Sequence, residues 1–119
     1  MKRKGCRIAV VEEDDALREL VRRWLEGAGH VVEAHAVAEP LGDIELVIAE
    51  IANPRDAAAL LARLAQPALD APVLLLSARF RSGQGDSAHL ADELGVSAVL
   101  PKPFTQRQLL AAVAKALRR

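Results

Sequence analysis

The sequence predicts an α/β fold: a doubly wound, five-stranded parallel sheet in a single domain spanning residues 1–119. Short apolar runs alternate along the chain with segments of helical periodicity, the order expected of parallel strands joined by helices. Right-handed crossovers then place helices on both faces of the sheet. Hydrophobic residues make up 51% of the 119 residues and aromatic residues only 3%. The core is therefore expected to consist of Leu, Val, Ile and Ala, which suits parallel strands buried between helices.

Five apolar runs have the length and composition of buried strands. These strands are expected at Arg7–Val11, Val31–Ala36, Glu45–Glu50, Pro72–Ser77 and Ser97–Leu100.

The first and last helices carry the clearest helix signals. Asp14 or Asp15 can cap the first helix, and Gly27 and Gly29 end it. The last helix begins with a capping box, residues 105–108, in which a threonine is followed three residues later by a glutamine.

The connections between the middle strands are less regular. Pro40 and Gly42 lie so close together that residues 38–42 allow only one helical turn or an irregular crossover. Asn53-Pro54 begins the next helix, since proline is tolerated in a first turn. Residues 79–87 form a polar loop, and a short helix with Leu90 and Leu94 follows and ends at Gly95.

Composition excludes several classes of function. Sixteen basic and sixteen acidic residues give a formal net charge of zero, so net charge attracts neither nucleic acid nor an anionic membrane. Cys6 is the single cysteine, which fits a reducing compartment. No apolar run is long enough to cross a bilayer. We therefore expect a soluble cytoplasmic protein.

Polar side chains follow four of the expected strands, where the carboxyl ends of parallel strands share one edge. Glu12 and Glu13 follow the first strand, Glu50 ends the third, Ser77 ends the fourth and Lys102 follows the fifth. This set, with Pro103-Phe104 after the lysine, resembles the receiver domain of bacterial response regulators over essentially the whole chain. The resemblance implies a flavodoxin-like sheet of order 2-1-3-4-5 with a shortened second helix, and a site near the topological switch point.

The resemblance also implies a role for each residue. Glu50 holds the position of the phosphoacceptor aspartate, and Ser77 and Lys102 form the phosphoryl pocket. Glu12, Glu13 and Glu50 match the carboxylates that hold Mg²⁺. The bond before Pro103 is typically cis in the family. No residue is expected to be catalytic in the sense of an enzyme.

Three positions depart from the family pattern. Glu50 and Glu13 both replace an aspartate, and Val99 replaces the aromatic residue that swings inward on phosphorylation. An added methylene moves the Glu50 carboxylate about 1.5 Å, and a misplacement of roughly 1 Å can slow a reaction about a hundredfold. The longer arms also crowd an octahedral Mg²⁺ site. We therefore expect no cofactor unless the acidic pocket still binds Mg²⁺, and an ion pair between Glu50 and Lys102.

Each residue has a simpler interpretation when taken alone. Glu12 and Glu13 suit the N-terminus of any helix, Ser77 suits a turn, and Lys102 suits a solvated surface. The whole pattern favours a pseudo-receiver, a phosphorylation-independent signalling domain that acts by protein–protein interaction. The alternatives are an active phosphoacceptor receiver in a two-component phosphorelay and, less favoured, a small hydrolase on a similar sheet, for which no nucleophile and base stand together at the strand ends.

The expected partner is a signalling protein, such as a histidine kinase or a regulator, and homodimerisation is open. The resemblance places the contact surface on the last strand and helix, near Val99, Arg107, Ala111 and Ala114. No nucleic acid or membrane partner is expected.

Overall fold

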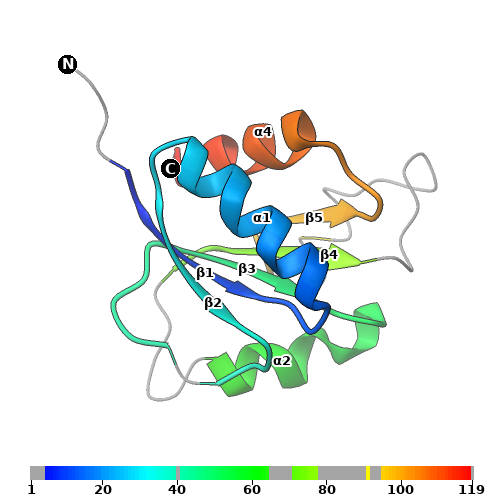
Figure 1. The fold of residues 1–119 in the computed structure, drawn as a ribbon. Helices are drawn as coiled ribbons and strands as arrows, with labels where there is room; N and C mark the ends of the chain where they lie inside the picture. Colours follow the sequence, from blue (N-terminus) through cyan, green and yellow to red (C-terminus); the bar gives the residue numbers. More distant parts are fainter. Residues whose placement is uncertain (1–4, 40, 65–70, 78–90, 92–94, 119) are drawn as a thin grey trace.

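The computed structural model describes residues 5–39, 41–64, 71–77, 91 and 95–118. Five strands form one parallel sheet in the order β2-β1-β3-β4-β5, as expected (Figure 1). The strands are β1 (Arg7–Val11), β2 (Val31–His35), β3 (Leu46–Glu50), β4 (Val73–Ser77) and β5 (Ala98–Pro101). The described helices are α1 (Asp15–Gly27), the short 3₁₀ helix η1 (Pro54–Asp56), α2 (Ala57–Leu64) and α4 (Gln106–Leu117).

The helices cover both faces of the sheet, which confirms the doubly wound arrangement. Helices α1 and α4 lie together on one face, and α2 lies on the other (Figure 1). Successive side chains of a strand point to opposite faces. In β1, accordingly, Ile8 and Val10 pack with α1 and α4, whereas Ala9 and Val11 pack with α2. Two apolar clusters result, and the central strands β3 and β4 contribute to both.

The helix signals in the sequence correspond to real caps. The Asp14 side chain accepts a hydrogen bond from the Leu17 amide at 2.9 Å at the start of α1. At the start of α4, Thr105 accepts from the Gln108 amide at 3.1 Å, and the Gln108 side chain accepts from the Thr105 amide at 2.8 Å. These contacts satisfy amides that have no partner within the helix. The predicted capping box is confirmed.

Two glycines fix the turn that follows α1. Gly29 has a φ of 99°, in the left-handed region that favours glycine. A Cβ atom on Gly5 would lie 1.7 Å from the carbonyl oxygen of Gly29, so only glycine fits at that position. The close approach lets the start of β1 run directly beside the turn, and the Val31 amide donates to the Cys6 carbonyl at 2.9 Å.

The connection between β2 and β3 contains no helical turn among residues 36–39 and 41–45. Of the two predicted alternatives, the described residues therefore follow the irregular crossover. Leu41 is 7% exposed and enters the α2-side cluster, while Ala38 and Ile44 pack against it. The crossover buries apolar side chains without a helix.

The predicted polar loop at residues 79–87 and the helix around Leu90 and Leu94 lie outside the described residues. Gly95, predicted to end that helix, has a φ of 74°. None of the described helices is long and apolar enough to cross a membrane.

Candidate functional site at the carboxyl ends of the strands

The sheet brings the predicted polar residues to one edge. Glu50 pairs in register with Leu76, and Ser77 pairs with Pro101. The Lys102 amide donates to the Ser77 carbonyl at 3.0 Å, which extends the β4–β5 ladder by one residue. The carboxyl ends of β3, β4 and β5 are therefore aligned, and the residues that follow them face a common region.

Lys102 carries the main electrostatic contacts of this edge. Its Nζ lies 3.2 Å from Glu12 Oε1 and 3.7 Å from Glu50 Oε2. The lysine side chain is 18% exposed, and the glutamate side chains are 2% and 21% exposed. The expected contact between Glu50 and Lys102 is present. The shorter contact with Glu12 was not predicted, because spacing along a sequence does not determine which of several carboxylates a long lysine reaches.

Glu12 is held in place from both ends. Its backbone amide donates to the His35 carbonyl at 3.0 Å, and its Oε2 accepts from the Asp14 amide at 3.1 Å. The other oxygen, Oε1, makes no hydrogen bond within the described part of the chain, so its contact with Lys102 is an ion pair. A charged group this deeply buried requires a compensating charge, and Lys102 supplies it.

The environment of Glu50 acts on its pKa in both directions. Partial burial raises the pKa of the Glu50 carboxyl, the positive charge of Lys102 lowers it, and the negative charges of Glu12 and Glu13 raise it again. The net shift is upward, because desolvation is the largest of these effects.

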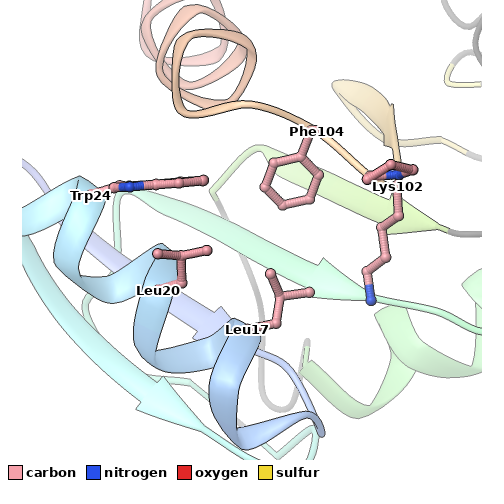
Figure 2. Close-up of a pocket in the computed structure, with 6 residues that line it drawn as sticks. Leu17, Leu20, Trp24, Lys102 and Phe104 are labelled. Carbon is pink, nitrogen blue, oxygen red and sulfur yellow. The ribbon is translucent and has the colours of Figure 1, made fainter.

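The lysine–proline bond between Lys102 and Pro103 is cis, as the family resemblance implied. Phe104 follows it and contacts Trp24 of α1 edge-on, with ring centroids 6.4 Å apart and an interplanar angle of 66°. The segment after β5 thus packs against α1 while Lys102 points to the strand ends (Figure 2).

Two other predicted positions, Ser77 and Val99, are both buried. Ser77 is fully buried at the end of β4. Val99 is 6% exposed in β5 and packs in the cluster beneath α2. Val99 is therefore not part of an exposed contact surface, whereas Arg107, Ala111 and Ala114 are exposed on α4.

The predicted magnesium ligands, Glu12, Glu13 and Glu50, do not converge on one point as metal ligands do. Glu13 is exposed beside the buried Glu12, and the described residues include no group of three or more His, Cys, Asp or Glu placed to hold a metal ion. The position between Glu12 and Glu50 is reached by the ammonium of Lys102. Glu12 and Glu50 are therefore arranged to pair with the Lys102 ammonium. They are not arranged to coordinate Mg²⁺, which needs short oxygen contacts in octahedral geometry.

The fold and the polar strand ends together define a doubly wound α/β domain of receiver type. No protein family model matches the chain. It is 32% identical over 120 residues to the DNA-binding transcriptional regulator NtrC of Rhizobium meliloti, covering 95% of this chain and 24% of NtrC. It is 36% identical over 123 residues to the response regulator MprA of Mycobacterium ulcerans, covering 97% of this chain and 51% of MprA.

Solved structures agree at the level of the fold. The non-phosphorylated HemR receiver domain from Leptospira biflexa superposes with a TM-score of 0.73 at 24% identity, covering 97% of this chain and 96% of that receiver domain chain. A response regulator from Thermotoga maritima superposes with a TM-score of 0.76 at 22% identity, covering 97% of this chain and 99% of that chain. The chain belongs to the response regulator receiver domains. It spans about half the length of MprA and about a quarter of NtrC.

Proposed function

We propose that this receiver domain is a pseudo-receiver, which signals through protein–protein contacts without accepting a phosphoryl group. The observation that carries the proposal is the position of the Lys102 ammonium, 3.7 Å from Glu50 Oε2 and 3.2 Å from Glu12 Oε1. In this proposal, the Glu50–Lys102 pair replaces the contact between lysine and phosphoryl group that the family resemblance implies.

In this proposal, the negative charge of Glu50 substitutes permanently, but only in part, for the charge of a phosphoryl group. An ionised glutamate carries one negative charge, whereas a phosphoryl group carries up to about two. Lys102 is shared between two carboxylates, so Glu50 receives only part of its compensation. The pocket would therefore remain in one electrostatic state instead of switching between two.

The buried valine of β5 supports the same proposal. Val99 is 6% exposed and belongs to the apolar cluster on the α2 side of the sheet. An aliphatic side chain has no ring to exchange between exposed and buried positions, so the readout that the resemblance implies for this position is absent. A partner would then recognise a fixed surface.

The exposed face of α4 is the contact surface we propose for that partner. Arg107, Ala111 and Ala114 are exposed and follow one another at helical spacing. Small side chains let another backbone approach closely, and Arg107 offers a charged group at the start of the helix. A signalling protein, such as a histidine kinase or a regulator, or a second copy of the chain would bind there.

Phosphorylation of intact protein tests the proposal. The protein is incubated with acetyl phosphate and Mg²⁺, and its intact mass is measured beside a receiver that has aspartate at the acceptor position. We expect an adduct on the control receiver and none on this chain. A stoichiometric adduct that disappears in Glu50→Gln would contradict the proposal.

An active phosphoacceptor receiver remains the second candidate, because the retained pocket favours it. The Lys102 amide donates to the Ser77 carbonyl at 3.0 Å, so the two residues that the resemblance assigns to a phosphoryl pocket lie at adjacent strand ends. The same mass measurement separates the two candidates.

A further inference from the structure

A cavity of about 460 Å³ lies between α1 and the segment that follows β5. Its walls come from two places in the sequence, as Figure 2 shows. The lining residues are Leu17, Leu20, Trp24, Lys102, Pro103 and Phe104. None of the predicted site residues except Lys102 lines it.

The walls are almost entirely apolar. Leu17 and Leu20 lie along α1 one turn apart, and Phe104 lies between Trp24 and Lys102 and contacts the Trp24 ring edge-on. Leu20 is 40% exposed, so part of this large apolar side chain is open to solvent at the cavity. Binding sites for small molecules typically have volumes of about 300–1,000 Å³ and mostly apolar walls. The size and the lining both fall within that class.

The charges at the cavity restrict what can bind. Among the described residues, Lys102 is the single charged residue of the lining, and its ammonium already pairs with Glu12 and Glu50. An anionic ligand would have to compete with those two carboxylates and would be repelled by them. A cationic ligand would lie beside the lysine. Both charges are therefore disfavoured.

We infer that this cavity binds a neutral, largely apolar small molecule with one or two aromatic rings. Aromatic ligands pack well on Trp24 and Phe104, because edge-to-face and offset stacks between rings add to the gain from apolar burial. The aliphatic stem of Lys102 completes the wall without presenting a free charge. Glu50 does not line this cavity, so the inference does not depend on whether Glu50 accepts a phosphoryl group.

The protein has a built-in reporter for the test, since Trp24 is the only tryptophan in the chain. The probe is N-phenylnaphthylamine, a neutral aromatic dye whose emission rises in apolar surroundings. Titration of the dye should quench Trp24 emission, raise dye emission and saturate at one dye per chain.

A matched pair of variants makes the test specific. Leu20→Gln changes an exposed residue of the cavity, and Val37→Gln changes an exposed valine, 64% accessible, that does not line it. Leu20→Gln should raise the dissociation constant of the dye about tenfold. Val37→Gln should leave it within about twofold of the wild-type value.

Three results would overturn the inference. One is the absence of saturable quenching up to the solubility limit of the dye. Another is an equal loss of binding in both variants, which would indicate non-specific adsorption. The third is a dimer in sedimentation velocity that dissociates in Leu20→Gln, which would mean that a second copy covers the cavity. A monomer that binds one dye and is weakened only by Leu20→Gln supports it.

Discussion

The Nζ atom of Lys102 lies 3.2 Å from Oε1 of Glu12, so the lysine after β5 pairs with the carboxylate after β1 across the width of β3 and β4. This pair joins strands that are not neighbours in the sheet. It also gives the buried carboxylate its charge compensation, and the same lysine pairs with Glu50.

Replacing Lys102 should therefore destabilise the protein. Lys102→Met keeps much of the apolar stem but leaves Glu12, 2% exposed, without a cation. Removing one partner of a buried ion pair costs about 3 kcal/mol. Urea unfolding should show a loss of that order. Lys115→Met, at an exposed lysine of α4, is the control and should change stability by less than about 0.5 kcal/mol. Equal effects of the two changes would contradict the assigned role of Lys102.

Glu12 and Glu13 should respond very differently to the same substitution. Glu12→Gln removes the charge opposite Lys102 at a buried position, and should cost about 1–2 kcal/mol of unfolding free energy. Glu13→Gln changes an exposed side chain and should cost less than about 0.5 kcal/mol. Thermal or urea unfolding of the two variants in parallel gives the comparison. A larger effect at Glu13 would contradict the inward direction of Glu12.

The raised pKa of Glu50 predicts a specific pH dependence. A carboxyl whose pKa is higher in the folded state binds more protons there than in the unfolded chain, so its contribution favours folding at low pH. That contribution is fully present below the ordinary glutamate pKa of about 4.3, and it is lost as pH rises through the folded value. Relative to Glu50→Gln, the wild-type protein should therefore become less stable as pH increases across this window.

The control for this pH profile is Glu33→Gln, on an edge strand away from Lys102. The unfolding free energy of the wild type minus that of Glu50→Gln should decrease as pH rises. The decrease should be larger than the corresponding change for Glu33→Gln. A rising difference would mean that the pKa of Glu50 is lowered by its lysine.

The capping box at α4 should contribute to stability independently of the site. Thr105→Ala removes the oxygen that accepts from the Gln108 amide and should cost about 1 kcal/mol. Thr105→Ser retains that oxygen and should recover most of the loss. If alanine and serine gave the same unfolding midpoint in urea, the cap would not stabilise this helix.

The regular elements could be predicted because their signals are local. The capping box at Thr105 and Gln108 and the aspartate cap of α1 depend on neighbouring residues only, and each was found in place. The strand order followed from the family resemblance and agrees with the structure. For the crossover between β2 and β3 the sequence allows two alternatives, because Pro40 and Gly42 weaken a helix without specifying what replaces it.

The sequence indicated which polar residues gather at the strand ends, but it did not indicate all the contacts that they make with one another. Sequence order brought Glu50 and Lys102 together correctly. It did not indicate that Glu12 would be the nearer partner or that Glu13 would face solvent. A partial signal existed: side chains alternate along an extended chain, so Glu12 continues the inward direction of Val10. Trp24 packs against the apolar cluster on the α1 and α4 side of the sheet and also lines the cavity beside α1.

The most direct test of the pseudo-receiver proposal is the intact mass of the wild-type chain and of Glu50→Asp after acetyl phosphate and Mg²⁺. We expect no phosphoryl adduct on the wild-type chain at a donor concentration that fully modifies the aspartate-bearing control receiver. An adduct on Glu50→Asp alone would show that the acceptor residue is what prevents the reaction. A stoichiometric adduct on the wild-type chain, absent from Glu50→Gln, would contradict the account.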